Sequence, residues 1–541
     1  MSEPASASAY GLARRDTMVE LLERAAKAHV DRPFLVIDGV PSTYGDIDRR
    51  SNALARELAG LGVQKGQCVV TLLDTSADVF DCWFAINKLG AIWVPINTAY
   101  RGEFLRHQVA DTEARIVICD DKYLERFVHI ADQLTDVQLI LTRGGAIDAG
   151  CAIPIKPLDN FRGSDPSPLP LAVIPSDLAA LIYTSGTTGP SKGCMISHNY
   201  LAAAGRINRR HTILEEGRTL WTCLPVFHAA ALTAVISVMD EGFAIAVASQ
   251  FSVSRFWEDV EAANAVSAML MASIFQFVAE APECEAEKRY RGKLKMVFGT
   301  PISPPVRQIW HQRFGAQIVS SWAYGQTEAI RITGVPLDET PPELCAGRAV
   351  DEYEIKIFDE LDQPVPDGAV GEIVLRPRHP DIMFAGYWKR PDATAAAWKN
   401  LWMHTGDLGR IEGGHLFFCD RAKDYLRSRG ENISSFEVER SFLAHHAIAE
   451  VAVHAIGVQT GEDDIKVTAV LREGALVTEH ELCLWTLDNL PHFAVPRYIE
   501  FRGQLPKNPT GRVLKYQLRD EGCTPTTWDR EEAGIIVRRR K

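Results

Sequence analysis

Short apolar runs and longer amphipathic segments alternate through the first third of the chain. The apolar runs 68–73, 92–96 and 115–119 predict strands, and the amphipathic segments 47–61 and 77–89 predict helices. Gly62 and Gly90 end the two helical segments. Short apolar strands separated by amphipathic helices are typical of βαβ units, so the pattern favours an α/β fold with a mostly parallel sheet.

The pattern changes in the last quarter of the chain. Segments 165–170 and 359–371 are rich in turn residues and predict a surface connector and a link between short strands. Beyond about residue 421, Ser434-x-x-Glu437 and Thr478-x-x-Glu481 are capping boxes that predict helix starts. Residues 450–456 and 465–471 alternate as strands do. We therefore expect a domain boundary near Lys423, followed by a compact α+β unit.

Composition and charge exclude several classes of protein. The 541 residues are 46% hydrophobic and 24% charged, which excludes a disordered chain. The net charge of −12 gives no footprint for nucleic-acid binding. The 11 cysteines include no C-x-x-C pair, as in reduced cytoplasmic proteins. The N-terminus lacks a secretory h-region, and the longest apolar stretch, 229–239, is too short for a membrane helix. We expect a cytoplasmic protein without integral membrane contact.

The strongest chemical signal is the segment Tyr183–Gly193, which follows an expected strand at 178–182. Two glycines allow a tight bend, while hydroxyls and backbone N–H groups can cradle phosphate oxygens. These candidate ligands are Thr184, Ser185, Gly186, Thr187, Thr188 and the ammonium of Lys192. A Walker A loop is excluded, because its glycine spacing differs and a hydroxyl residue would follow the lysine.

This segment resembles the phosphate-binding signature of the adenylate-forming superfamily, which includes acyl- and aryl-CoA synthetases, peptide-synthetase adenylation domains and firefly luciferase. Further resembling motifs follow in the family's order, so that the resemblance covers about residues 20 to 520. They are Leu224-Pro-Val-Phe-His228, Phe298-Gly-Thr-Pro301, Tyr324-Gly-Gln-Thr-Glu328, the segments 402–409 and 420–424, Arg427-Ser-Arg-Gly-Glu-Asn-Ile433 and the segment 505–515.

The resemblance implies roles for individual residues. Gly299, Thr300, Pro301 and Tyr324 would contact the adenine of ATP, and Asp407 and Arg421 the ribose. Gly325 and Gln326, in the same motif as Tyr324, would also bind the nucleotide. Thr327 would reach the α-phosphate and Glu328 would hold Mg²⁺, which suits a hard cation shared with phosphate oxygens. His228 would lie between the acyl pocket and the path of the thiol. For CoA, Gly430 would let the pantetheine arm pass and Arg427 would meet its phosphates.

One position departs from the family. A lysine normally follows the glycine of the last motif and contacts carboxylate and α-phosphate during adenylation, whereas this chain has Arg512. A guanidinium is planar and larger than an ammonium, so the exchange is not conservative. Either Arg512 or Lys515 carries the role, with Lys507 a more distant candidate.

The implied fold is a large multi-subdomain N-terminal α/β domain, residues 1–421, with a small mobile α+β C-terminal domain, residues 422–541, hinged at Lys423. The implied reaction is AMP-forming carboxylate–CoA ligation with ATP, Mg²⁺ and CoA: acid and ATP give acyl-AMP and pyrophosphate, and CoA then gives acyl-CoA and AMP. A carrier-loading adenylation enzyme, a luciferase-like oxidase and a non-catalytic relative are the alternatives.

The acid is less defined than the reaction. Segments 94–101 and 428–433 look similar to the crotonobetaine/carnitine–CoA ligase branch. A carnitine-type, fatty or steroid side-chain acid is expected. The oligomeric state is left open, with a homodimer as one option.

Overall fold

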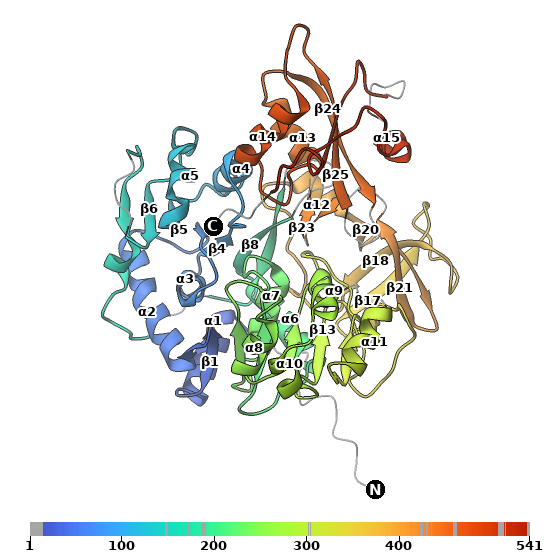
Figure 1. The fold of residues 1–541 in the computed structure, drawn as a ribbon. Helices are drawn as coiled ribbons and strands as arrows, with labels where there is room; N and C mark the ends of the chain where they lie inside the picture. The colour runs from blue at the N-terminus through green and yellow to red at the C-terminus, as the bar shows by residue number, and fades with distance from the viewer. Residues whose placement is uncertain are drawn as a thin grey trace.

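A large α/β body carries a smaller α+β part at its carboxy-terminal end, coloured orange to red in Figure 1. The computed structural model describes residues 15–145, 150–170, 173–184, 191–300, 302, 304–421, 426–428, 431–433, 435–457, 463–506, 513 and 515–537. The expected fold class is confirmed. The boundary after residue 421 stays a prediction, and its hinge, Lys423, lies outside the described residues.

The first sheet contains the strands predicted from the early apolar runs. Its order is β7 (Ile155–Pro157), β6 (Leu139–Arg143), β5 (Ile116–Asp120), β3 (Cys68–Leu72), β4 (Ile92–Pro95), β8 (Leu178–Thr184) and β9 (Lys192–Ser197). All neighbours are parallel except β8 and β9, which are antiparallel. Every residue of β3 and β5 is buried, as expected for parallel strands covered on both faces.

A second sheet of the same size lies beside the first. Its order is β14 (Ile318–Ser320), β13 (Met296–Phe298), β12 (Ala265–Met269), β10 (Thr219–Thr222), β11 (Ala244–Val247), β1 (Pro33–Ile37) and β2 (Val40–Thr43). Only the β1–β2 pair is antiparallel. The carboxyl ends of β10, β12 and β13 therefore meet at one edge, where the loops that follow them can share a site.

Helices cover both sheets (Figure 1). They are α1 (Met18–Ala28), α2 (Tyr44–Gly60), α3 (Ala77–Lys88), α4 (Gly102–Thr112), α5 (Leu124–Val128), α6 (His198–Arg210), α7 (Ala229–Ser237), α8 (Phe256–Ala262), α9 (Ala272–Glu280), α10 (Glu285–Tyr290) and α11 (Pro304–Gln312). Helix α12 (Pro391–Ala397) lies against β19 (Trp398–Lys399) and β20 (Trp402–Glu412) of a third sheet. The two predicted helices are α2 and α3. Helix α2 begins earlier than its apolar spacing indicated, because Thr43 caps it and accepts the N–H of Asp46. Among the described residues, every helix is too short or too polar to span a bilayer.

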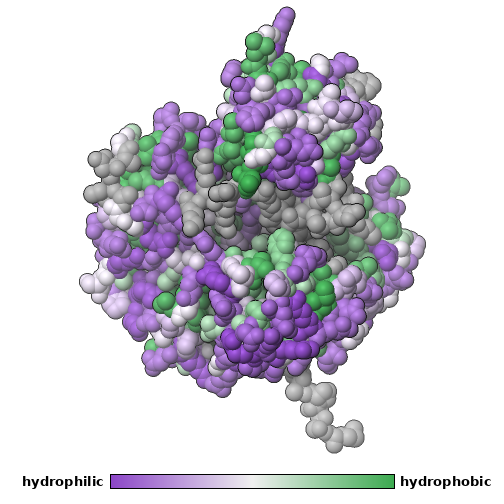
Figure 2. All heavy atoms as spheres, in the orientation of Figure 1, coloured by the Kyte–Doolittle hydropathy of each residue, from purple (hydrophilic) through white to green (hydrophobic). Residues whose placement is uncertain are grey.

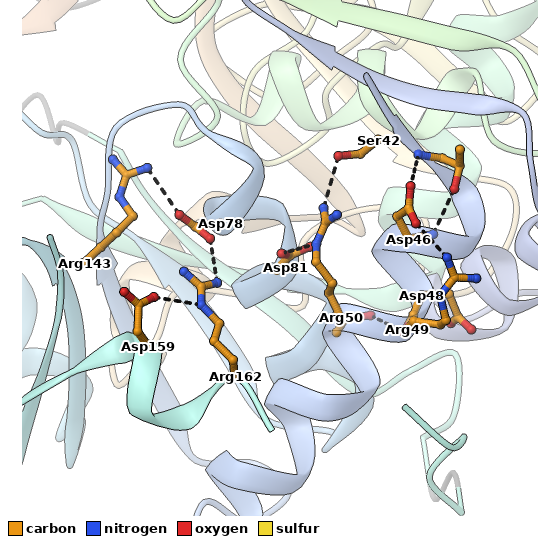
Figure 3. A network of polar contacts seen from close by, with 12 residues as sticks. Ser42, Asp46, Asp48, Arg49, Arg50, Asp78, Asp81, Arg143, Asp159 and Arg162 are labelled. Atoms are coloured by element: carbon orange, nitrogen blue, oxygen red, sulfur yellow. Dashed lines mark hydrogen bonds and ion pairs between the residues drawn. The ribbon is translucent and has the colours of Figure 1, made fainter. Parts of the chain in front are cut away.

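Ion pairs fix the helices beside the first sheet (Figure 3). Arg50 of α2 donates to Asp81 of α3, with Nε and Oδ2 2.7 Å apart. Arg162, which follows the short helix η4 (Leu158–Phe161), donates to Asp78 of α3 at 2.6 Å. Burial raises the pKa of Asp81 to about 6, and its bond with Arg50 opposes that rise. Helix α3 is thus held from both sides by charged partners.

The predicted connector and turn are both present. Segment 165–170 has no regular structure and lies along α2, where Asn52 donates to the carbonyl of Pro166. Segment 359–371 links β17 (Tyr353–Phe358) to β18 (Gly371–Pro377), which pair antiparallel. With β19 (Trp398–Lys399), β20 (Trp402–Glu412) and β21 (His415–Arg421), these strands form a third sheet. The short strands β15 (Thr333–Gly334) and β16 (Arg348–Ala349) pair separately.

The small part has its own sheet and core. Its strands are β24 (Ile448–Gly457), β25 (Asp463–Leu471), β26 (Tyr498–Phe501) and β27 (Trp528–Asp529), and its helices are α13 (Ser435–Leu443), α14 (Glu479–Asn489) and α15 (Lys515–Glu521). The hairpin β22 (Leu426–Ser428) and β23 (Glu431–Ile433) precedes them. The capping box of Thr478 and Glu481 is confirmed at the start of α14. Ser434 of the other box lies outside the described residues.

A buried ion pair holds β25 to β26. Lys466 and Glu500 approach to 2.5 Å with side chains 0% and 3% exposed. Arg502 also donates to Glu500, at 2.8 Å. Burial alone would raise the pKa of Glu500, but its bonds with Arg502 and Lys466 outweigh this effect and lower it to about 2. The ionised carboxylate therefore stabilises the small part.

We expect Glu500→Gln to lower the free energy of unfolding by about 3 kcal/mol, because Lys466 is left buried without a counter-charge. The stabilisation should be complete above the ordinary pKa of 4.5 and lost as the pH falls toward about 2. Scanning calorimetry at pH 7 and pH 3 measures both effects. Glu285→Gln is the control, since its carboxylate pairs with Lys288 but is 77% exposed. Equal melting temperatures for the two variants would contradict the assignment.

Candidate active site

A cleft of about 1290 Å³ opens between the large and small parts. Residues from the predicted motifs that line it are Thr184, Lys192, His228, Gly325, Gln326, Thr327, Glu328 and Asp407. Glu431 of the small part borders the same cavity. Figure 2 shows the small part standing above the large part, with hydrophilic residues spread over the visible surface of both. With Glu431 included, the fold thus brings together residues from five separate segments of the chain.

The expected phosphate segment lies at the edge of the first sheet. Thr184 ends β8 and Lys192 begins β9, and these two residues pair across the antiparallel ladder. Ser185, Gly186, Thr187 and Thr188 lie outside the described residues. Helix α4 supports the segment, because Gln108 donates to the hydroxyl of Ser191 at 3.2 Å and His107 contacts the Ser191 carbonyl at 2.9 Å.

Tyr387 contacts both the Glu328 carboxylate and the Lys192 ammonium. The hydroxyl of Tyr387 donates to Glu328 at 2.6 Å. The Lys192 ammonium lies 4.4 Å from the centre of the Tyr387 ring. Glu328 is 7% exposed. The Tyr387 ring therefore lies between a buried carboxylate, which its hydroxyl contacts, and the ammonium of Lys192 over its face.

A tight turn carries Gln326 and Thr327 into the cleft. The backbones of Gln326 and Ala329 exchange two hydrogen bonds, at 3.1 and 3.0 Å. A Cβ on Gly325 would lie 2.6 Å from the Ile330 backbone, so this position requires glycine. The buried Nε2 of Gln326 has no hydrogen-bond partner among the described residues, which leaves a donor for a ligand.

The expected adenine segments lie behind the cleft lining. Gly299 follows β13, and a Cβ there would lie 2.1 Å from the Leu270 carbonyl. The Thr300 hydroxyl donates to the carbonyl of Ala323 at 3.4 Å, which joins the two adenine segments. Gly299, Thr300 and Tyr324 do not themselves line the described cavity, and Pro301 lies outside the described residues.

The expected ribose residues are adjacent. Asp407 of β20 pairs with Arg421 of β21 across the sheet, which places both backbones at one register position. The Tyr324 hydroxyl donates to Asp407 at 2.6 Å. Asp407 is 4% exposed, and its backbone N–H binds the Thr405 hydroxyl at 3.1 Å. Tyr324 therefore orients the carboxylate that would accept the ribose hydroxyls.

His228 faces the small part. It caps the start of α7, and its Nε2 lies 3.3 Å from Oε2 of Glu431 on the β22–β23 hairpin. Burial would lower the pKa of His228, but the Glu431 carboxylate outweighs burial and raises it. Protonation of the imidazole is therefore favoured by the carboxylate that faces it across the cleft.

Lys515 points into the small part. Its Nζ lies 2.5 Å from Glu439 of α13 and donates to the Ser435 hydroxyl at 2.8 Å. The side chain of Arg427, and the whole of Gly430 and Arg512, lie outside the described residues. In this arrangement the β22–β23 hairpin borders the cavity, while Lys515 is held by partners on its own domain.

Two sequence patterns match this chain. That of the AMP-binding enzyme matches residues 22–388, and that of the AMP-binding enzyme C-terminal domain matches residues 437–512. The chain belongs to the AMP-binding enzyme family. The crotonobetaine/carnitine–CoA ligases of Citrobacter koseri and Salmonella arizonae are 29% and 30% identical to it over 485 and 487 residues. Each match covers 88% of this chain and 93% of the relative. This AMP-binding enzyme is accordingly an acid–thiol ligase.

Solved structures show the same fold. An o-succinylbenzoate CoA synthetase from Bacillus subtilis, bound with a product analogue, superposes with a TM-score of 0.78 at 22% identity, covering 93% of this chain and 99% of that one. A fatty acyl CoA synthetase from Mycobacterium tuberculosis superposes with a TM-score of 0.67 at 24% identity, covering 93% and 98%. The two-part architecture of this AMP-binding enzyme is thus that of its family.

The residues present fit Mg·ATP. The described residues hold no cluster of three or more side chains that could cage a metal on their own. Mg²⁺ commonly binds one or two carboxylates together with substrate phosphates, which a single buried Glu328 satisfies. The unpaired amide of Gln326 and the nearby ammonium of Lys192 add a donor and a positive charge for the same phosphates.

Sequence reasoning missed two residues of this AMP-binding enzyme. The only local signal for Tyr387 in the sequence is that it follows a glycine, Gly386. In the structure this glycine has φ +129°, in the region that favours glycine. Glu431 follows Gly430 in the motif Arg427–Ile433, and this position next to a glycine was the available signal. Neither local pattern indicates contact with Glu328 or His228.

We expect Tyr387→Phe to slow carboxylate-dependent ATP–pyrophosphate exchange about tenfold, because Glu328 loses a charge-assisted hydrogen bond. The Mg²⁺ concentration for half-maximal exchange should rise, while the retained ring keeps its contact with Lys192. Tyr353→Phe is the control, since that buried hydroxyl donates to the Ile382 carbonyl at 2.5 Å, away from Glu328. A similar change of Mg²⁺ dependence in both variants would refute this role.

Proposed function

We propose that this enzyme activates a carboxylic acid as its acyl-AMP and then transfers the acyl group to CoA in the same cleft. The observation that carries the proposal is the contact of Glu431 with His228 in a cavity also lined by Lys192, Glu328 and Asp407. The hairpin expected to bring the thiol thus borders the residues expected to hold the nucleotide.

In the first step a carboxylate oxygen attacks the α-phosphate of ATP, and pyrophosphate leaves. A carboxylate is a poor electrophile, and joining it to AMP supplies a good leaving group. The chain's task is positioning and charge stabilisation, with Lys192 facing the phosphates and Asp407 fixing the ribose. Glu328 would hold Mg²⁺, which neutralises phosphate charge when bound.

In the second step the CoA thiol attacks the acyl carbon and AMP leaves. The small part is docked for this step. Arg101, which caps α4, donates to the Leu487 carbonyl of α14 at 3.2 Å, and the rings of Tyr100 and Phe493 lie 6.3 Å apart. Phe104 of α4 lies in the small part's hydrophobic core. We infer that adenylation uses another placement of the small part, reached about the hinge at Lys423.

Arg512 is the proposed adenylation cation. Support comes from Lys515, whose ammonium is held by Glu439 and Ser435 of the same domain. Lys515 would have to break its ion pair with Glu439 to reach the substrate. Arg512 instead stands at the position of the family's adenylation lysine. We also propose a cytoplasmic location, since the described cysteines are free thiols and mostly buried.

The test is ATP–pyrophosphate exchange with a panel of acids, with and without CoA. Exchange that depends on one acid, followed by AMP and acyl-CoA formation when CoA is added, is the expected result. Exchange without thioester formation would favour a carrier-loading or oxidative enzyme. No exchange with any acid, in a protein that binds ATP, would overturn the proposal.

We expect Glu431→Gln to slow thiolysis of supplied acyl-AMP about tenfold and to spare pyrophosphate exchange, because it weakens only the docked arrangement. Docking through His228 should be strongest below the ordinary pKa of 6.5 and be lost as the pH rises through the raised pKa. The pH midpoint of thiolysis should therefore fall in the variant. Glu473→Gln, on an exposed turn of the small part, is the control. Equal loss in both half-reactions would contradict the docking role.

A further inference from the structure

One wall of the cleft is apolar. It is formed by Leu224, Phe227, Ala229, Ala230, Met271 and Ile330. These residues come from the carboxyl ends of β10 and β12, the first turn of α7 and the turn that follows Thr327. The two alanines are short, so they leave space beside the larger side chains.

This wall lies where the acyl group must extend. Ile330 directly follows the tight turn, closed between Gln326 and Ala329, that carries Thr327, the residue expected at the α-phosphate. His228 lies between Phe227 and Ala229 and faces Glu431, on the side from which the thiol arrives. An acyl group joined to the α-phosphate and open to the thiol therefore passes along the apolar wall.

The charges of the cleft lie elsewhere. Glu328 and Asp407 belong to the nucleotide side and accept bonds from Tyr387 and Tyr324. Glu372 accepts bonds from His404 and from the Gly406 backbone in the third sheet.

Two further carboxylates line the cavity. Asp359 accepts the backbone N–H groups of Leu361 and Gln363. Glu360 follows it in the same loop of the third sheet. Glu431 faces the imidazole of His228, which lies between the wall residues Phe227 and Ala229.

The six residues of the wall include no carboxylate, and Phe227 is their one benzene ring. The cavity's other benzene rings belong to segments outside this wall: Tyr100 just before α4, Tyr183 of β8, Phe358 of β17 and Tyr387 beside β9. A buried quaternary ammonium group requires an aromatic cage or a counter-charge. A neutral hydrocarbon group gains from the same wall, because its burial removes apolar surface from water.

We propose that the acyl pocket selects a neutral, apolar acyl group and rejects a trimethylammonium acyl group, although the curated relatives are named for crotonobetaine and carnitine. This inference rests on the proposed ligase function. It assigns substrate discrimination to the wall around Phe227 and Met271, and it concerns the charge of the acyl group rather than its length.

The decisive comparison uses two acids of the same shape. Crotonobetaine and 5,5-dimethylhex-2-enoic acid differ in one atom, a quaternary nitrogen in the first and a quaternary carbon in the second. We expect kcat/KM for pyrophosphate exchange to be at least about a hundredfold higher with the neutral acid, since an unpaired buried charge is strongly disfavoured. Unbranched neutral acids of six to twelve carbons, assayed beside them, extend the comparison to other lengths.

The outcomes separate this inference from the ligase proposal. Preference for neutral acids of any length supports it. Equal or better use of crotonobetaine or carnitine overturns it and leaves the ligase intact. If Glu431→Gln then abolished that use, Glu431 would be the counter-ion and the apolar wall would not decide the choice. Failure of every acid, with ATP still bound, would refute the ligase proposal instead.

A charge placed on the wall provides a second test. Met271→Glu should raise the crotonobetaine to neutral-acid ratio about tenfold, whereas Met271→Gln, which has the same size without charge, should not. The wild-type comparison keeps the inference falsifiable if the variants fold poorly. A ratio that responds equally to both variants would show that size, and not charge, governs the pocket.

Discussion

The buried carboxylate of Glu328 constrains the whole cleft. A carboxylate that is 7% exposed requires polar partners, and the Tyr387 hydroxyl donates to it while the Lys192 ammonium lies over the Tyr387 ring. To bring them there, segment 384–388 runs beside β9, with the Trp388 N–H bonded to the Gly193 carbonyl. The Phe384 N–H also binds the Glu328 carbonyl. Three segments that are distant in the sequence, around Glu328, in β9 and at 384–388, are thus fixed around one carboxylate. A polyphosphate and its cation would bind next to it.

Helix α4 contacts both the phosphate segment and the small part that the second half-reaction would use. Its first turn contacts the small part through Arg101 and Phe104, and Gln108 farther along holds Ser191 next to Lys192. One rigid element of 11 residues therefore touches both the phosphate segment and the docked domain. Loss of pyrophosphate and docking of the thiol hairpin would act on opposite ends of the same helix, which gives the two steps a physical route for coupling.

The sequence predicted the elements whose signals are local. Strands β3 and β5 follow from unbroken apolar runs, and α14 follows from the Thr478 and Glu481 capping box, because such signals lie within a few residues. The motif residues were singled out because their types and spacing resemble a family, and their individual roles stay predictions. Tyr387 and Glu431 were not singled out, since their contacts with Glu328 and His228 join residues 59 and 203 positions apart. Only the completed fold creates those pairs.

The cleft meets two opposite chemical demands by dividing its walls. A nucleotide requires fixed charges and hydrogen-bond donors, which come from the edge of the first sheet and from β20. An acyl group requires the absence of unpaired charge, which the ends of β10 and β12 provide. Because both walls converge on the turn of Gln326 and Thr327, the bond formed in the first step lies at their boundary. The hairpin carrying Glu431 meets His228 beside the apolar wall, so the proposed thiol path and the proposed acyl pocket adjoin in one cleft.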